Sequence, residues 1–194
     1  MESTAGTISE NGPGLNMASG RVFYPFAIWK NIITIEDIAH GLAGKFRFAG
    51  LSDRLYTVAQ HCVEVSRRFG DDRYAALWGL LHDAAEAWVG DVPSPIKPFV
   101  FFAVPDAGGG VYMRSYVAIE EEILQAVANK FGLFRGMPEE IHAVDLRERE
   151  RERRDLYDIP AESTSVEPYP ELAWPLSPGE SERQFLERFR ELTA

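Results

Sequence analysis

The chain has 194 residues, of which 45% are hydrophobic and 26% charged, and its formal net charge is −10. This composition is ordinary for a soluble globular domain, and no apolar run reaches the roughly 18 residues that a membrane-spanning helix needs. The negative charge argues against a nucleic-acid polymer as partner, because that binding depends on neutralising many phosphates, whereas a single nucleotide needs only a few local cations or a metal.

Cysteine content and the first residues bear on compartment and domain organisation. Cys62 is the only cysteine, which excludes an internal disulfide and fits a reducing cytoplasm. The first 20 residues have neither the basic region nor the apolar region of a secretory signal. We therefore predict a cytoplasmic protein with a disordered tail at residues 1–19 and a single domain at residues 20–194.

Helical periodicity dominates the first half of the domain. Thr34 is placed to cap a helix that carries Ile38 and Leu42 on one face. Thr57, with Gln60 three residues later, forms a capping box for the segment YTVAQHCVEVSRRFG, which ends at a glycine. The sequence predicts two helices here.

Further helices are predicted along the rest of the chain. One opens near Asp72 and closes at Gly90, and a second ends at Gly132. A third opens at Pro138 and runs through LRERERERRDL, because proline is tolerated in the first turn of a helix. Ser181 is placed to cap the last helix.

Two segments between these helices lack a helical pattern. Residues 91–111, rich in proline, phenylalanine and glycine, are interpreted as a loop, and the proline-rich residues 158–180 are interpreted as an irregular connector. No alternating strand pattern of useful length appears. The predicted fold class is therefore all-α, an irregular helical bundle around a site.

The apolar stretch LLHDAAEAWVGDVPSPIK contains ionisable residues whose burial is costly unless they are paired or bound to a metal. On a helix, His82 and Asp83 lie about 100° apart, so both can reach one point beside it. Glu86 follows one turn later over the same face. The pattern indicates either a face turned to water or a site in which a carboxylate lies near a metal.

A divalent metal with nitrogen and oxygen ligands needs more than two protein groups. His61 in the preceding helix is the candidate third ligand, and Asp145, on the same face as apolar Ile141, is the best remaining carboxylate. Plainer alternatives stand beside this one. A His-Asp dipeptide alone is weak evidence, His61 can be an ordinary partly buried histidine, and Asp145 can belong to the charged surface that the stretch from Arg147 to Arg154 predicts.

Other conspicuous side chains are interpreted as structural. His40 and His142 are assigned to structural or surface positions. Cys62 points a different way round its helix from His61 and is assigned to the core. Trp78 and Trp88 are assigned to packing and not to substrate binding.

Four segments, in chain order, resemble the HD-domain metal-dependent phosphohydrolases: KFRFAG, YTVAQH, LLHDAAEAWVGDVPSPIK and AVDLRERE. Within that family the chain looks like the small bacterial 5′-deoxynucleotidases and their phage-encoded relatives, some of which hydrolyse deoxyadenosine triphosphate. The resemblance runs from about Ile35 to Tyr157. Together the four segments are a far more specific signal than the His-Asp dipeptide.

The resemblance implies a metal site and a catalytic group. One divalent metal would be held by His61, His82, Asp83 and Asp145. Glu86 matches the catalytic carboxylate of the family. Because the ligand set mixes nitrogen and oxygen, cobalt, manganese, zinc or iron suits it better than magnesium.

The resemblance also implies substrate contacts. Asp91, in the GD-x-P turn, matches the acidic residue beside the nucleotide and is the second catalytic candidate. Arg47 matches a basic substrate-binding position, and Phe48 stands where the deoxynucleotidases carry a tryptophan. The spacing from Arg47 to His61 is one residue shorter than in those enzymes. Lys97 is expected to contact phosphate.

The expected function is metal-dependent removal of 5′-phosphate from 2′-deoxyribonucleotides, as monophosphates or triphosphates. The expected partner is a small-molecule deoxynucleotide, with no membrane, and the chain is expected to form a homo-oligomer. Two alternatives are hydrolysis of a signalling nucleotide such as guanosine tetraphosphate, which other HD proteins perform, and nucleotide binding by a regulator that has lost catalysis. The GD-x-P turn favours the deoxynucleotidases, and a complete ligand set with Glu86 argues against a regulator.

Overall fold

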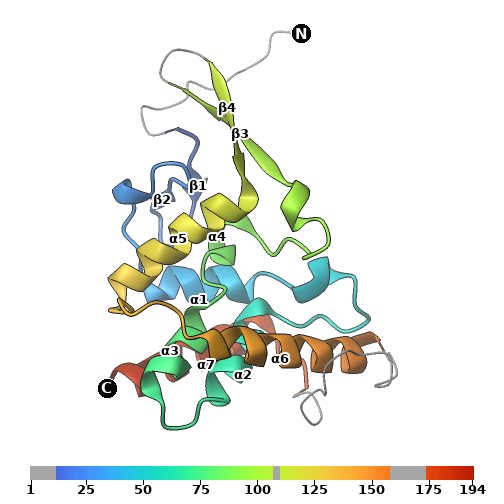
Figure 1. Ribbon diagram of the computed structural model, residues 1–194. Coiled ribbons are helices and arrows are strands. Elements are labelled where there is room, and N and C mark those ends of the chain that lie inside the picture. Colours follow the sequence, from blue (N-terminus) through green and yellow to red (C-terminus); the bar gives the residue numbers. More distant parts are fainter. Residues whose placement is uncertain (1–11, 107–109, 158–173) are drawn as a thin grey trace.

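The computed structural model describes residues 12–106, 110–157 and 174–194, and it confirms the predicted all-α class. Its helices form an irregular bundle, and two small antiparallel sheets lie outside it (Figure 1). The helices are α1 (Ile35–Ala43), α2 (Val58–Arg67), α3 (Arg73–Leu81), α4 (Glu86–Val89), α5 (Tyr116–Lys130), α6 (Glu139–Tyr157) and α7 (Pro178–Thr193). The 3₁₀ helices are η1 (Ile28–Lys30), η2 (Arg47–Gly50) and η3 (Lys97–Phe99), and the strands are β1 (Leu15–Asn16), β2 (Val22–Phe23), β3 (Phe101–Pro105) and β4 (Val111–Ser115). Within the described chain, no helix combines the length and apolarity needed to cross a membrane.

Side-chain caps start α1 and α2 at the predicted residues. Thr34 Oγ1 accepts a hydrogen bond from the backbone N–H of Asp37 at 3.3 Å, and Thr57 Oγ1 accepts one from that of Gln60 at 3.0 Å. Each cap satisfies an N–H group that the first turn of a helix leaves without a partner. His61, the next residue after Gln60, is thereby held at a fixed position in the first turn of α2.

Helix α2 lies at the centre of the bundle, packed against α1, α3, α6 and α7. All of its residues from 58 to 66 are buried. Gly79 of α3 lies so close to α2 that a β-carbon there would be 3.0 Å from the Cα of Ser66. Only glycine allows this approach of two backbones. It brings the end of α3, and with it His82, beside His61.

Helix α3 ends just before His82, so the prediction of one continuous helix from Asp72 to Gly90 is wrong. A tight turn follows, in which the N–H of Ala84 donates to the carbonyl of Leu81 and the N–H of Glu86 to that of Asp83, both at 3.0 Å. Hydrogen bonds over three residues wind the backbone more tightly than an α-helix does. His82 and Asp83 still reach one point from this turn, with Oδ2 of Asp83 3.3 Å from Nε2 of His82.

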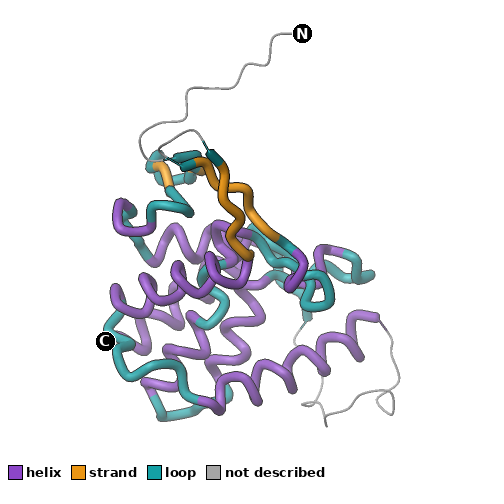
Figure 2. Tube along the Cα trace, turned by 45° about the horizontal axis from the view of Figure 1, so that its top comes forward, coloured by secondary structure: helices purple, strands orange, loops and turns teal. Residues whose placement is uncertain are grey.

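Strands β3 and β4 form an antiparallel hairpin that projects away from the helices (Figures 1 and 2). Phe101 pairs with Ser115, so the hairpin corrects both the interpretation of residues 91–111 as a loop and the expectation of no strand of useful length. The alternating pattern is hidden because apolar side chains such as Phe101, Val111 and Met113 are exposed. A pattern search that looks for one apolar and one polar face misses such a hairpin.

The described part of the predicted disordered tail contains strand β1, and residues 1–11 lie outside the described residues. Leu15 of β1 pairs with Phe23 of β2. The sulfur of Met17 accepts a hydrogen bond from Nε1 of Trp88 at 3.3 Å. The prediction of disorder is therefore wrong for Leu15 to Met17, because these residues pair with β2 and pack on α4.

Helix α7 begins earlier than predicted, with Ser177 and not Ser181 as its cap. Ser177 Oγ accepts a hydrogen bond from the backbone N–H of Glu180 at 3.3 Å, and a proline takes the first helical position. The connector predicted at residues 158–180 therefore overlaps the first turn of α7. Residues 158–173 lie outside the described residues.

Candidate metal centre

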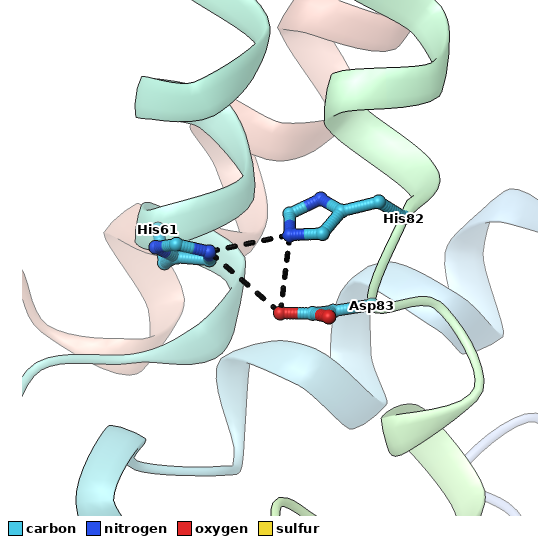
Figure 3. A group of neighbouring side chains, drawn as sticks. All are labelled: His61, His82 and Asp83. Carbon is cyan, nitrogen blue, oxygen red and sulfur yellow. Dashed lines mark hydrogen bonds and ion pairs between the residues drawn. The ribbon is translucent and has the colours of Figure 1, made fainter. Parts of the chain in front are cut away.

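His61, His82 and Asp83 each bring one ligand atom to a common point (Figure 3). The two histidine Nε2 atoms lie 3.3 Å apart. Asp83 Oδ2 lies 3.3 Å from Nε2 of His82 and 3.7 Å from Nε2 of His61. Ligands held about 2.0–2.2 Å from a tetrahedral ion are about 3.3–3.6 Å from one another. The three groups can therefore hold a metal ion.

Asp145, on α6, brings a fourth potential ligand atom beside the two histidine nitrogens. Its Oδ1 lies 3.1 Å from Nε2 of His61 and 3.8 Å from Nε2 of His82. The Asp145 side chain is 29% exposed, so the point is open to solvent on this side. The structure thus brings the four predicted ligands together from α2, the turn before α4, and α6.

The second ring nitrogen of each histidine already has a hydrogen-bond acceptor. His61 Nδ1 lies 2.6 Å from Oε1 of Glu152, and His82 Nδ1 lies 2.8 Å from the backbone carbonyl of Gly79. A neutral ring that donates from Nδ1 has a lone pair on Nε2. Two such lone pairs then face two carboxylates, an arrangement of acceptors that a cation stabilises. This donor set fits a metal ion, and a carboxylate and a backbone carbonyl at Nδ1 are the partners that typically orient metal-bound histidines.

The pKa values in the centre shift in the direction that favours positive charge there. Burial alone would lower the pKa of His82, but the charge of Asp83 and hydrogen bonding to Asp145 raise it well above its usual value. Burial would raise the pKa of Asp145, but its hydrogen bonds to His61 and His82 hold it well below its usual value. Both shifts favour the charged forms, an imidazolium beside a carboxylate.

Arg47 lies beside the centre and is 8% exposed. Its Nε donates to Oε2 of Glu152 at 3.0 Å, and Nη1 lies 3.5 Å from Oδ2 of Asp83. The backbone N–H of Arg47 donates to the carbonyl of Tyr56 at 2.8 Å, which ties η2 to the residue before the α2 cap. Glu152 therefore anchors both a metal-site histidine and the predicted substrate-binding arginine.

Phe48 and Ala49 adopt positive φ angles of 58° and 54°, which side chains other than glycine rarely adopt. The strained turn holds the Phe48 ring edge-on to Tyr157, with ring centroids 5.4 Å apart. Such strain persists only where the surrounding structure enforces it, and it is common at functional sites. Phe48 is therefore held as a rigid apolar wall next to Arg47.

A cleft of about 440 Å³ opens over these residues. Its walls come from η2, from the turn after α4 and from the second half of α6. The lining residues are Arg47, Phe48, Asp91, Pro93, Ser94, Pro95, Arg149, Glu150 and Arg153. The cleft has the size of a small-molecule site, and it combines apolar surface with a few charged groups.

Glu86 lies at the start of α4 and is 3% exposed. Burial raises its pKa well above the usual value, and the charges of Asp83 and Asp91 raise it further. Its Oε2 has no hydrogen-bond partner among the described residues, and its Oε1 lies 3.8 Å from Nζ of Lys97. A buried carboxyl group with one oxygen left unpaired is suited to hold a water molecule.

Asp91 and Lys97, the other two predicted substrate contacts, lie in different surroundings. Asp91 lines the cleft, and burial, together with the charge of Asp83, raises its pKa. Lys97 does not belong to the cleft lining. Its Nζ donates to Oε1 and Oε2 of Glu120 at 2.9 and 3.2 Å, so this carboxylate, with Glu86, neutralises it.

The predicted charged surface from Arg147 to Arg154 is partly buried, which corrects that interpretation. Glu148 and Glu152 are 0% exposed and Arg151 is 2% exposed. Arg68 donates to Glu148 at 2.5 Å, and Arg151 forms an ion pair with Glu148. These carboxylates tolerate burial because each has a basic partner.

A signal for Glu152 was present in the sequence. Ile141, Asp145, Glu148, Glu152 and Leu156 recur every three or four residues along α6 and so share one face. Apolar residues bracket that stripe, and both are buried. Because acidic and basic residues alternate in this stretch, the sequence pattern predicted a solvent-exposed surface.

The residues interpreted as structural lie where that interpretation places them. His40 and His142 are exposed, and Cys62 is buried in the core. Trp78 is 4% exposed within the core cluster. Trp88 stacks on Phe23 with ring centroids 4.2 Å apart.

Comparison with known proteins identifies relatives of this chain. An Escherichia coli K12 protein, the uncharacterized protein YfdR, is 35% identical over 180 residues, which span 90% of this chain and 93% of YfdR. The chain belongs to the YfdR family. An uncharacterized protein of Rhodobacter capsulatus is 36% identical over 108 residues, which span 52% of this chain and 49% of that protein. No protein-family model matches the chain.

Membership of the YfdR family extends over the whole candidate site. The aligned length of 180 residues leaves only a small part of the chain outside the match. The names of the relatives carry no activity, so the chemistry of the site rests on its own geometry.

Proposed function

We propose that this member of the YfdR family is a metal-dependent phosphohydrolase that removes phosphate from the 5′ position of 2′-deoxyribonucleotides. One observation carries the proposal. Two histidine Nε2 atoms lie 3.3 Å apart, and one oxygen of Asp83 and one of Asp145 each lie within 4 Å of both, beside a cleft that contains a buried arginine. The resemblance of the four sequence segments to HD-domain phosphohydrolases supports the same chemistry.

His61, His82, Asp83 and Asp145 would hold one divalent ion, with cobalt, manganese, zinc or iron as the preferred metals. When bound, such an ion lowers the pKa of water and offsets charge on a phosphoryl oxygen. Glu152 keeps the His61 ring in the orientation that presents Nε2 to the centre. The chain thus supplies a preorganised ligand set.

Glu86 is the proposed general base. Its unpaired Oε2 is free to accept a proton from the attacking water, and its raised pKa makes it a stronger base than an exposed glutamate. Positioning and electrostatic stabilisation account for most phosphoryl-transfer catalysis, so the orientation of this carboxyl group matters as much as its pKa.

Arg47 and Phe48 are the proposed substrate-binding groups of η2. Glu152 fixes Nε of Arg47, which leaves the terminal nitrogens directed at the centre, where a phosphate would lie. Phe48 would form an apolar wall against C2′ of the sugar, and Asp91 would accept a hydrogen bond from a sugar hydroxyl. A ribonucleotide would then bury its 2′-hydroxyl without a partner, at a cost of about 1–3 kcal/mol.

Metal content tests the ligand set. We expect His82→Ala and Asp145→Ala to purify with strongly reduced metal in elemental analysis, because each loses a ligand. His142→Ala is the matched control, since His142 is an exposed histidine on the same helix as Asp145. Full occupancy in Asp145→Ala would remove Asp145 from the site.

A substrate panel tests the reaction. Steady-state kinetics on dAMP, AMP, dATP and ATP should show release of phosphate or triphosphate, with the deoxy forms favoured by roughly one to two powers of ten. Phe48→Ala should reduce that preference while metal content stays unchanged, and Asp91→Ala should lower turnover of the deoxynucleotides themselves. Phe99→Ala, at an exposed phenylalanine outside the cleft, is the control. Equal efficiency on ribo and deoxy forms would contradict the deoxynucleotide assignment.

A further inference from the structure

The charges that line the cleft are unevenly paired. Arg47 is neutralised by Glu152 and Asp83, and Nη1 of Arg153 lies 3.1 Å from both carboxylate oxygens of Glu150. Arg149 differs from both. Within residues 12–106, 110–157 and 174–194 its guanidinium makes no hydrogen bond and no ion pair.

The position of Arg149 is as distinctive as its lack of a partner. It is half-buried on α6 and lines the cleft with Arg47 and Phe48. Arg149 follows Asp145 by four residues, so both lie on the same side of the helix, about 6 Å apart along its axis. Arg153 follows after one more turn. The cleft therefore leads away from the metal centre along α6, and Arg149 is the first basic side chain on that path.

A half-buried cation without a counter-charge indicates an anionic ligand. Guanidinium groups bind phosphate oxygens through two parallel hydrogen bonds, which suits them to phosphate recognition. The metal centre and Arg47 can offset the charge of one phosphate. Each further phosphate of a nucleotide carries additional charge past the centre, where Arg149 lies.

We propose that Arg149 binds the phosphates of the substrate that lie beyond the one at the metal centre, and that the chain therefore prefers nucleoside di- and triphosphates to monophosphates. This inference rests on the proposed phosphohydrolase function. Arg153 is a weaker second contact, because Glu150 already compensates its charge.

The test compares kcat/KM for dAMP, dADP and dATP in the wild type, Arg149→Ala and Arg149→Lys. The wild type should favour dATP over dAMP. Loss of a charge-assisted contact should lower kcat/KM for dATP roughly 10- to 100-fold in Arg149→Ala, with dAMP within about threefold of wild type. Arg149→Lys should recover part of the loss, because lysine keeps the positive charge but cannot form the two parallel hydrogen bonds of a guanidinium. Thermal melting should show that the variants are folded.

Arg190→Ala is the matched control, since Arg190 is an exposed arginine on α7 and the variant changes the net charge by the same amount. Equal losses on dAMP and dATP in Arg149→Ala would overturn the proposal, because the residue would then bind the nucleoside or the first phosphate. A wild type that favours dAMP would overturn it as well.

A wild type that hydrolyses no nucleotide would count against the proposed function, and a second measurement then decides this one. Isothermal titration of EDTA-treated protein with inorganic tripolyphosphate needs no turnover. Tighter binding of tripolyphosphate than of inorganic phosphate, weakened by Arg149→Ala and unchanged in Arg190→Ala, would support the subsite. Binding that Arg149→Ala leaves unchanged would overturn it.

Discussion

Two charged segments of this chain meet at the candidate centre, and they handle their charges in opposite ways. In the first, residues 82–91, which we call the His-Asp segment, the ionisable groups are two acceptors at the centre, a buried glutamate and an aspartate. In the second, residues 147–154, which we call the charged segment, acidic and basic residues alternate and pair with each other and with α2. The first segment has no lysine or arginine of its own, so the cations that pair with its carboxylates come from other segments.

The difference shows what makes a buried charge functional or structural. Glu148 has basic partners at hydrogen-bond distance and completes a buried ion network. Glu86 is equally buried, but one of its oxygens has no partner in the described chain. Burial raises the pKa of both carboxyl groups, but ion pairs fix Glu148 in place, whereas the unpaired oxygen of Glu86 remains available for chemistry.

Glu152 joins the two classes, because it belongs to the charged segment yet contacts the centre. Burial would raise its pKa, but the charges of Arg47 and His61 hold it below its usual value. It is therefore an ionised carboxylate at pH 7, with one oxygen for each partner. The comparison predicts different consequences when Glu86, Glu152 or the histidines of the centre are altered.

The largest effect is expected for Glu86→Gln. Turnover should fall by about 10²–10⁴-fold, because a general base is lost, while metal content and the melting temperature change little. Single-turnover kinetics and elemental analysis measure the two quantities separately. Glu121→Gln, at an exposed glutamate of α5, is the control. Near-normal rates would transfer the role of base to another group, with Asp91 the next candidate.

Glu152→Gln should damage the centre without touching substrate. The amide NH2 group of the glutamine must face either Nδ1 of His61 or Nε of Arg47, and since both of these donate, one hydrogen bond is lost. The buried arginine also loses its charge partner. Breaking a buried pair costs about 3–5 kcal/mol of stability, and loss of a carboxylate that orients a metal-bound histidine lowers metal affinity about 10- to 100-fold. Denaturant unfolding and metal titration check the two effects.

Glu140→Gln is the control for that experiment, since Glu140 is exposed in the first turn of the same helix. If Glu152→Gln kept the wild-type metal affinity, the charged segment would have no role in metal binding. The ion pairs of the charged segment would then only stabilise the fold, and the His-Asp segment alone would serve the centre.

The smallest effect is expected from pH on the metal-free protein. The pKa values of His61 and His82 are raised in the folded state, so their contribution to stability is fully present below about pH 6.5 and is lost as pH rises through the raised values. Thermal unfolding in EDTA should therefore show a melting temperature that falls on the alkaline side. Added manganese or zinc should reverse the fall, because the ion replaces the protons. His82→Ala should lack most of this dependence, and an unchanged profile in that variant would assign it to other groups.

Local sequence signals determined much of the helical framework. Thr34 and Thr57 cap their helices because a side-chain oxygen three residues before an amide satisfies it wherever the helix lies in the fold. The apolar spacing fixed the class of the fold for the same reason. The residue types of the His-Asp segment also narrowed its interpretation to a face turned to water or a site near a metal, since unpaired ionisable groups are costly to bury in an apolar stretch.

Only the tertiary structure decided how the site is assembled. Three features depend on contacts between segments far apart in the sequence. They are the end of α3 before His82, the close approach of Gly79 to α2 and the burial of Glu152. A run of alternating charges has the same local pattern whether it faces water or a set of buried partners. Which of its members pair, and that Arg149 is left without a partner among the described residues, follows from what α6 packs against, because electrostatic pairing is set by distance in space and not by order along the chain.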